Sequence, residues 1–333
     1  MERLFEILRD DVPLPPSEVN IERAMRAGRR RVRGRMLSVG ALVVAVLSVV
    51  SVVGLARTPG VETAQPPGAE FDPLRRVITL DSSVASMTRY ETARHWQQAY
   101  LATEEGVGDL TVFAPGRPLV DDAGHPIDPK TGTPADPVQG RPAYWIKLDD
   151  DFALAWQWTD GGWAFLSIAA EGTYIPARDA MARVASAVRV TAGSPVTTPF
   201  TMPRPEHRKF VGTDTSFMLD PRRGTYLVFA ADDPTHPDEM TYPNLVPSRP
   251  TETRIIVGVD ESMDTGAGHS NRTVDGHLAR VSGNEISIYD VIGRFDIRAR
   301  GSADGETLFA IGRTVRLVPN PADESTWTDR PLR

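Results

Sequence analysis

The chain contains no cysteine among its 333 residues. Disulfide bonds and cysteine-ligated metal sites are therefore excluded, and any folded part must be stabilised by burial of side chains alone. Lysine is almost as scarce, because only Lys130, Lys147 and Lys209 occur among 37 basic residues. The other basic residues are arginines, which we interpret as the preference of a GC-rich genome rather than as a special arginine chemistry.

The sequence also lacks the common signatures of catalysis. It contains no G-x-S-x-G elbow, S-x-x-K motif or glycine-rich phosphate loop. The six histidines are His95, His125, His207, His236, His269 and His277. None of them has the i, i+4 spacing that would place two zinc ligands on one helix face. The acidic runs at 121–122 and 149–151 lack the pattern of a calcium loop and are interpreted as solvated turns. We therefore predict a non-enzymatic protein without catalytic residues, cofactor or metal.

One long uncharged apolar stretch divides the chain. Residues 36–56, MLSVGALVVAVLSVVSVVGLA, are long enough as a helix, at about 1.5 Å per residue, to cross the roughly 30 Å core of a bilayer. A cleaved signal peptide is the alternative, and Gly54-Leu55-Ala56 fits a small-x-small cleavage site. The apolar region of a signal peptide is normally shorter, about 7 to 15 residues, so we favour an uncleaved signal anchor.

A basic cluster precedes this stretch. It consists of Arg29, Arg30, Arg31, Arg33 and Arg35, whereas only Arg57 follows directly. This asymmetry predicts a single-pass protein of the cell membrane with a cytoplasmic N-terminus and an extracytoplasmic C-terminal region. Residues 1–35 carry nine Arg against six Asp plus Glu, net +3, so the remainder carries −10 to reach the total of −7. An acidic exterior argues against nucleic acid as a partner.

Two distant segments of the exterior resemble each other in seven collinear runs. Among the stronger pairs, Val138-Gln-Gly-Arg-Pro-Ala-Tyr matches Val274-Asp-Gly-His-Leu-Ala-Arg, and Leu154-Ala-Trp-Gln-Trp matches Ile286-Ser-Ile-Tyr-Asp. A collinear set of matches is hard to obtain by chance, so the sequence predicts a tandem duplication.

Each copy is expected to combine strands with one helix. Segments rich in β-branched and aromatic residues predict strands at 74–80, 109–114, 142–148, 152–158 and 163–169. Residues 92–101 are ambiguous and are interpreted as a further strand. The dipeptide Gly161-Gly162 and the tripeptide Ser282-Gly283-Asn284 indicate tight turns. Apolar residues at helical spacing predict helices at 177–188 and 306–315.

The predicted fold class is α+β: a single transmembrane helix followed by two tandem units, each a curved antiparallel sheet with a C-terminal helix. The predicted parts are a cytoplasmic basic leader (1–35), a transmembrane helix (36–56), a proline-rich spacer (57–73), a first extracytoplasmic unit (74–192), a linker (193–205), a second unit (206–320) and a flexible tail (321–333). The leader is interpreted either as two short amphipathic helices or as a disordered tail.

One strand of the first copy carries a row of large apolar side chains. Phe152, Leu154, Trp156 and Trp158 alternate along it and share one face. An ordinary core is one interpretation of this face. The other is a half-barrel groove that holds a lipid or a peptide, since ligand sites are mostly aromatic and apolar.

The chain resembles a known family in four runs of the first copy. They are Gly140-Arg-Pro-Ala-Tyr-Trp, Leu154-Ala-Trp-Gln-Trp, Gly161-Gly162-Trp163 and Val184-Ala-Ser-Ala-Val. The pattern resembles the extracytoplasmic domains of bacterial, in particular actinobacterial, transmembrane anti-sigma factors. These domains are similar to the half-barrels of lipoprotein carriers and of periplasmic regulators of the envelope stress sigma pathway. The resemblance implies a cytoplasmic partner, a sigma factor, for residues 1–35.

The leader departs from that family. A zinc-bearing anti-sigma module needs a His-x3-Cys-x2-Cys pattern, which a chain without cysteine cannot have. A leader of residues 1–35 is also shorter than the helical bundle that usually clasps a sigma factor. Three functional hypotheses follow: an envelope-sensing regulator, a membrane-tethered lipid or lipoprotein binding module, and, least favoured, a cell-envelope hydrolase.

Overall fold

The computed structural model describes residues 70–120, 126–148, 151–170, 177–217, 223–231, 254–261 and 268–333. All described residues belong to one compact unit, Leu55–Arg333. The predicted membrane span at 36–56 and the basic cluster before it lie outside the described residues and stay predictions. Within the described ranges, no helix is long and apolar enough to cross a membrane.

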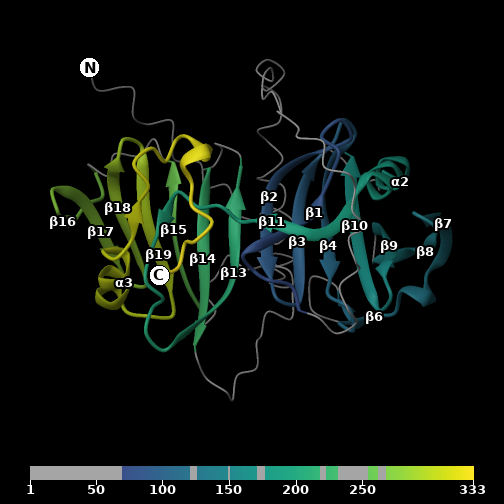
Figure 1. The fold of residues 1–333 in the computed structure, drawn as a ribbon, viewed down its shortest axis with the longest axis horizontal. Helices are drawn as coiled ribbons and strands as arrows, with labels where there is room; N and C mark the ends of the chain where they lie inside the picture. Colours follow the sequence, from purple (N-terminus) through teal and green to yellow (C-terminus); the bar gives the residue numbers. More distant parts are fainter. Residues whose placement is uncertain are drawn as a thin grey trace, which may run out of the picture. The chain divides into compact units, whose positions relative to one another are not determined.

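One large antiparallel sheet dominates the described residues (Figure 1). In sheet order its fourteen strands are β16 (Arg272–Val274), β17 (His277–Ser282), β18 (Glu285–Ile292), β19 (Phe295–Gly301), β15 (Arg254–Glu261), β14 (Gly224–Ala231), β13 (Arg208–Ser216), β2 (Ser86–Ala93), β3 (Trp96–Ala102), β4 (Gly106–Phe113), β10 (Gly162–Ala170), β9 (Asp151–Thr159), β8 (Arg141–Leu148) and β7 (Thr133–Val138).

Smaller elements surround this sheet. Three short antiparallel pairs are β1 (Arg75–Thr79) with β11 (Arg189–Pro195), β12 (Phe200–Thr201) with β20 (Arg316–Leu317), and β5 (Leu119–Val120) with β6 (Pro126–Ile127). The helices are α2 (Arg178–Ala187) and α3 (Gly305–Gly312), and two single 3₁₀ turns are η1 (Pro129–Thr131) and η2 (Glu324–Thr326).

The predicted α+β class with two separate units is wrong. The described residues are mostly antiparallel strands, their two α-helices have only ten and eight residues, and the strands of both copies belong to one sheet. Strand β2 of the first copy pairs antiparallel with β13 of the second, from Arg89 opposite Ser216 to Ala93 opposite Gly212. This pairing satisfies backbone groups that two separate sheets would each leave on an open edge.

The strand order is symmetrical about the β2–β13 pairing. Outward from it, β2, β3, β4, β10, β9, β8 and β7 on one side correspond to β13, β14, β15, β19, β18, β17 and β16 on the other. Helix α2 follows β10, and α3 follows β19. The segments that matched in sequence are therefore the two halves of a single sheet.

Local sequence explains most individual elements. The five predicted strands of the first copy are confirmed as β1, β4, β8, β9 and β10, and both predicted helices are found at their positions. Gly161 and Gly283 lie in turns between consecutive strands with φ of 71° and 57°, a conformation that glycine adopts without a steric cost. The expected strand at 92–101 is in fact the end of β2 and most of β3, separated by a bend at Arg94-His95.

Both faces of the sheet are buried. On the helix face, Met181 and Val184 of α2 pack on the first-half core that includes Leu166, and Leu308 of α3 packs on the second-half core. On the opposite face, a third apolar cluster crosses both halves and contains Trp96 of β3 together with side chains from β4, β10, β14 and β15. Burial on both faces accounts for strands such as β14 and β15, in which nearly every residue is buried.

The predicted linker and the predicted tail lie side by side. Thr198 and Thr328 exchange two backbone hydrogen bonds of 2.9 and 3.0 Å, and the Met202 amide donates to the Pro331 carbonyl at 2.8 Å. Phe200 and Met202 are buried in the second-half core. The end of the chain is therefore fixed against α3 and its core.

Candidate functional site

Polar side chains cross the middle of the sheet on the face opposite the helices. Cross-strand partners in an antiparallel sheet point to the same face, so the strand register defines this row. From β18 to β3 it consists of Ser287, Arg298, Gly258, Tyr226, Asp214, Glu91 and Gln98. We call the eight ionisable side chains in and next to this row the charge belt. They are Arg298, Asp296, Asp260, Tyr226, Asp214, Arg89, Glu91 and Tyr100.

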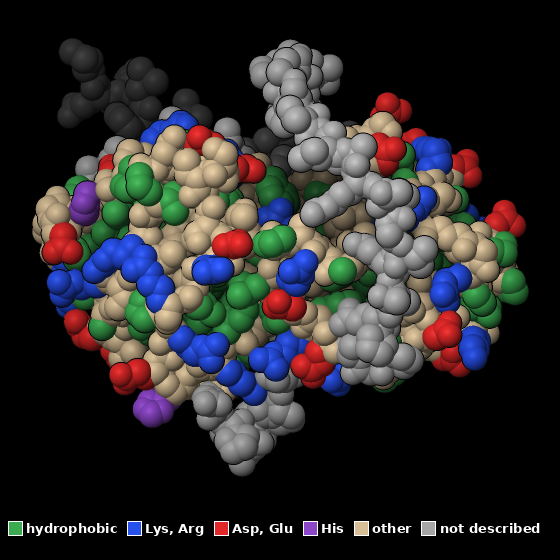
Figure 2. All heavy atoms as spheres, viewed as in Figure 1, with side chains coloured by type: hydrophobic (Ala, Val, Ile, Leu, Met, Phe, Trp, Pro, Cys, Tyr) green, Lys and Arg blue, Asp and Glu red, His purple; other side chains and the backbone are tan. Residues whose placement is uncertain are grey.

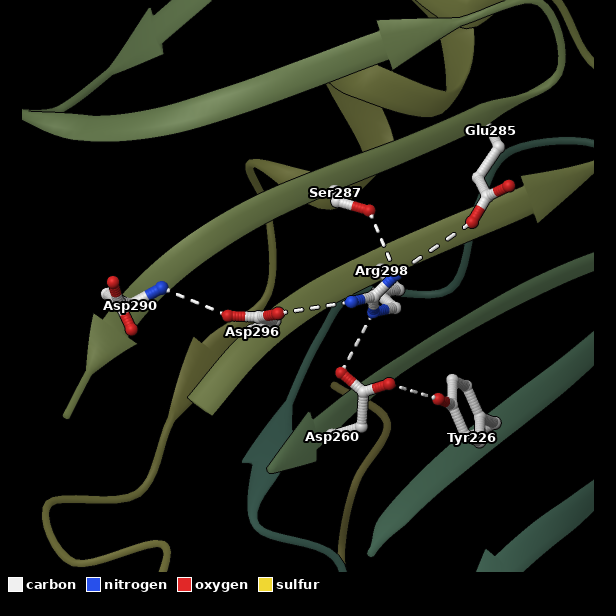
Figure 3. Close-up of polar contacts among 7 residues, drawn as sticks. All are labelled: Tyr226, Asp260, Glu285, Ser287, Asp290, Asp296 and Arg298. Atoms are coloured by element: carbon white, nitrogen blue, oxygen red, sulfur yellow. Dashed lines mark hydrogen bonds and ion pairs between the residues drawn. The ribbon is translucent and has the colours of Figure 1, made fainter. Parts of the chain in front are cut away.

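The second-half part of the belt is centred on Arg298 of β19 (Figure 3). Its Nε lies 3.0 Å from Oδ1 of Asp260, and its Nη2 lies 3.2 Å from Oδ2 of Asp296. The other oxygen of Asp260 accepts a 2.8 Å hydrogen bond from the Tyr226 hydroxyl. Both aspartates are 0% exposed. One guanidinium, on a side chain that is 15% exposed, therefore holds two buried carboxylates, one from β15 and one from β19.

A backbone irregularity supports Asp296. The register between β18 and β19 shifts between Ile288 and Ile292, and Asp290 in this interval has φ of 51°. Aspartate tolerates this conformation better than most residues. The Asp290 amide then donates a 3.1 Å hydrogen bond to Oδ1 of Asp296 (Figure 3). The carboxylate thus has one backbone partner and one charged partner.

Gly258 leaves room for the hydrogen bond between Tyr226 and Asp260 in the belt. It is the direct cross-strand partner of both Tyr226 and Arg298. A Cβ added at this position would lie 2.3 Å from Cδ1 of Tyr226 and 2.4 Å from the Thr225 carbonyl oxygen. The missing side chain therefore allows the tyrosine ring to lie over β15 and its hydroxyl to reach Asp260.

The first-half part of the belt repeats this arrangement around Arg89 of β2. Its Nε and Nη2 donate to the two carboxylate oxygens of Asp214 at 2.7 and 3.0 Å. Its Nη2 also lies 2.6 Å from Oε1 of Glu91. Its guanidinium carbon lies 5.0 Å from the ring centre of Tyr100, whose hydroxyl donates to Glu91 at 3.3 Å. Because Asp214 belongs to β13, this ion pair joins the two halves of the sheet.

Burial changes the protonation of several belt groups. It raises the pKa of Asp296 to about 6, although the Asp290 amide and Arg298 act in the opposite direction. Burial, followed by the charge of Asp260, raises the pKa of Tyr226 well above its usual value. Burial lowers the pKa of Arg89, but Asp214 and Glu91 raise it more, so the guanidinium stays charged. The raised pKa of Asp296 brings the titration of this carboxyl close to neutral pH.

The belt has the chemistry of an ion-pair network. Its arginines, carboxylates and tyrosines are bonded to one another. Among the described residues, no cluster of three or more His, Asp or Glu side chains is arranged to hold a metal ion. Such a network fixes the alignment of strands and responds to protons.

The structure places the four residues of the predicted apolar ligand face in or beside the first-half core. Leu154 and Trp156 are each 2% exposed and belong to the core that α2 covers. Trp158 is half-buried, donates its Nε1 hydrogen to the Phe113 carbonyl at 3.0 Å and lies against Phe71. The guanidinium carbon of Arg178 lies over the ring of Phe152, 4.4 Å from the ring centre. Side chains of α2 thus pack against this face in the structure, and its role as a ligand groove stays a prediction.

Sequence reasoning did not identify the belt. A single polar residue in an alternating strand normally indicates a solvent-facing position. The available signal was a charged residue inside an otherwise apolar strand, such as Asp260 after Ile-Ile-Val-Gly-Val or Asp296 between Phe295 and Ile297. Sequence alone does not show which of these carboxylates are covered.

No family model and no curated protein matches the chain. A solved structure, MucB in complex with MucA(peri), matches 69% of this chain and 92% of its own chain, with 11% sequence identity and a TM-score of 0.22.

Proposed function

We propose that the chain is a non-enzymatic, membrane-anchored regulator of the cell envelope. The charge belt is the observation that carries this proposal, because its buried charged groups bind one another instead of facing a substrate. The belt also crosses the β2–β13 pairing, so the two halves of the sheet respond to an extracytoplasmic partner as one body.

The sequence supports the topology of this regulator. The apolar stretch 36–56 is the membrane anchor, and the basic cluster before it keeps residues 1–35 in the cytoplasm. Residues 1–35 bind a cytoplasmic regulator, and a sigma factor is the first candidate for it. A single span has no internal packing to rearrange, so the signal passes by association, displacement or cleavage.

The test is affinity purification of the full-length protein from its own cells after cross-linking, with mass spectrometry of the captured proteins. The matched control lacks residues 2–25 but keeps the five arginines between 29 and 35, so its predicted topology is unchanged. We expect a cytoplasmic transcription regulator to be captured with the complete leader and lost with the shortened one. Capture of the same proteins by both forms would contradict the proposal.

A second measurement tests the alternative that the protein is a hydrolase. The full-length protein is assayed on broad panels of ester, glycoside and peptide substrates, beside an Asp260→Asn variant. We expect no turnover from either form. Turnover by the native chain that Asp260→Asn abolishes would identify the belt as an active site and contradict the non-enzymatic proposal.

A further inference from the structure

A surface hollow lies where α3 ends. Its volume is about 520 Å³, and its lining includes Pro203, Asp275, Arg313, Thr314, Arg316 and Arg333. These residues come from the segment after β12, the turn between β16 and β17, the end of α3, β20 and the C-terminus. Figure 2 shows Lys and Arg side chains gathered over α3 and the C-terminal end of the chain.

The charge of this hollow is opposite to that of the chain. Three arginines and one aspartate, Asp275, are among its lining residues, whereas the whole chain has a net charge of −7. Five arginines elsewhere each pair with a carboxylate: Arg141, Arg183, Arg223, Arg272 and Arg294. Within the described residues, no carboxylate pairs with the three arginines of the hollow.

The first half of the sheet provides an internal comparison. After α2, Nη1 of Arg189 donates to the Ser186 and Val188 carbonyls at 2.7 and 2.8 Å. After α3, Nη1 of Arg316 donates to the Arg313 and Val315 carbonyls at 2.6 and 2.9 Å. The residue three positions before each of these arginines is therefore equivalent in the two halves. It is Ser186 in the first half and Arg313 in the second. The hydrogen bonds to the carbonyls after α3 give the Arg316 side chain a structural role, but they give none to the side chain of Arg313.

Arg333 is brought to the hollow by the backbone. Its amide donates to the Met202 carbonyl at 3.1 Å, and the Met202 amide donates to the Pro331 carbonyl at 2.8 Å. This pairing fixes the last residue beside the end of α3. The guanidinium groups of Arg313 and Arg333 thus approach one hollow from two separate segments.

We propose that this hollow binds a phosphate ester. Two or more guanidinium groups suit a tetrahedral phosphate with several charged oxygens, whereas one arginine is sufficient for a planar carboxylate. The volume lies within the range of small-molecule sites, about 300 to 1,000 Å³, so a polyol or sugar attached to the phosphate also fits. Phosphate binding in this hollow does not depend on the binding of a regulator by residues 1–35. An experiment can therefore contradict one of the two proposals and leave the other standing.

The test uses the full-length protein in a neutral detergent, titrated with glycerol 3-phosphate by calorimetry, with glycerol as the uncharged control. We expect saturable binding that weakens with added salt and is absent for glycerol. The variant Arg313→Ser with Arg333→Ser should bind at least about tenfold more weakly, since it loses two charged contacts. Arg313→Ser introduces the residue of the equivalent position in the first half, Ser186, whose carbonyl accepts the same kind of hydrogen bond from an arginine.

The matched control is Arg280→Ser, which removes the same charge from an exposed position of β17 outside the hollow. It should bind glycerol 3-phosphate like the native chain. A second arm uses nanodiscs with and without phosphatidylglycerol, and selective binding there, without binding of glycerol 3-phosphate, assigns the phosphate to a lipid. The absence of saturable binding in both arms, or equal binding by the double variant, would overturn the proposal.

Discussion

Arg89 and Asp214 form a two-pronged ion pair across the strands that join the two halves of the sheet. The Nε–Oδ1 distance is 2.7 Å and the Nη2–Oδ2 distance is 3.0 Å. The side chains are 20% and 7% exposed, and Glu91, the second partner of Arg89, is 0% exposed. The attachment of one half to the other therefore depends on charges that are covered from water.

Replacing Arg89 should destabilise the protein strongly. Arg89→Met leaves Asp214 and Glu91 without their shared cation, and an unpaired buried charge typically costs about 3 to 5 kcal/mol. The free energy of unfolding is measured by urea titration of the full chain. Arg141→Met is the matched control, because its partner Asp160 is 88% exposed and such a pair contributes about 1 kcal/mol or less. Equal losses in the two variants would show that the Arg89 pair is not a special attachment.

A methyl group at position 258 should displace Tyr226. The added Cβ would lie 2.3 Å from its ring, so Gly258→Ala forces the ring away and breaks its hydrogen bond to Asp260. Overpacking of this kind costs about 1 to 3 kcal/mol, and the lost hydrogen bond about 1 kcal/mol more. Tyr226→Phe, which removes only the hydroxyl, separates the two contributions. If both variants lose the same stability, the ring has room and the steric argument is wrong.

The stability of the protein should depend on the proton of Asp296. Its pKa is raised to about 6 in the folded protein from 3.8, so the folded chain binds this proton more tightly than the unfolded chain. The contribution of Asp296 to the free energy of unfolding therefore falls as the pH rises through this interval, by about 1 to 3 kcal/mol.

The variant Asp296→Asn tests this dependence, because it cannot ionise and its side-chain oxygen still accepts the Asp290 amide hydrogen. We expect a flatter stability profile between about pH 4 and pH 6, measured by urea unfolding at each pH. Asp304 provides a control of opposite sign. Hydrogen bonds from the Thr307 amide and hydroxyl lower its pKa, so its stabilising contribution is lost at lower pH. An unchanged slope in Asp296→Asn would assign the pH dependence to other groups.

The apolar row of β9 should behave as core. Trp156 is 2% exposed beneath α2, so Trp156→Ala should lower the free energy of unfolding by about 3 to 5 kcal/mol. An open lipid groove predicts a different result at the neighbouring position. There, Trp158→Ala would weaken the binding of an apolar fluorescent probe and leave stability unchanged. Both quantities are measured on both variants, and retained stability with lost probe binding would favour the groove.

Local pattern was sufficient for many elements of the first half. The alternation of Leu154, Trp156 and Trp158 predicts β9, and the φ > 0 conformation open to Gly161 predicts the turn to β10. The apolar spacing of Met181 and Val184 predicts α2. These features depend on contacts between residues close in sequence, so one amino-acid sequence is enough to predict them.

The sequence by itself determined the composition, the seven matched runs, the apolar stretch 36–56 and most strands of the first copy. Only the tertiary structure decided that the two copies share one sheet. The antiparallel pairing of β2 with β13 connects residues more than a hundred positions apart, such as Arg89 and Asp214, and a local pattern carries no information about that pairing. The same holds for the belt, because whether a carboxylate is solvated or buried against an arginine depends on which strands lie beside it and on what covers them.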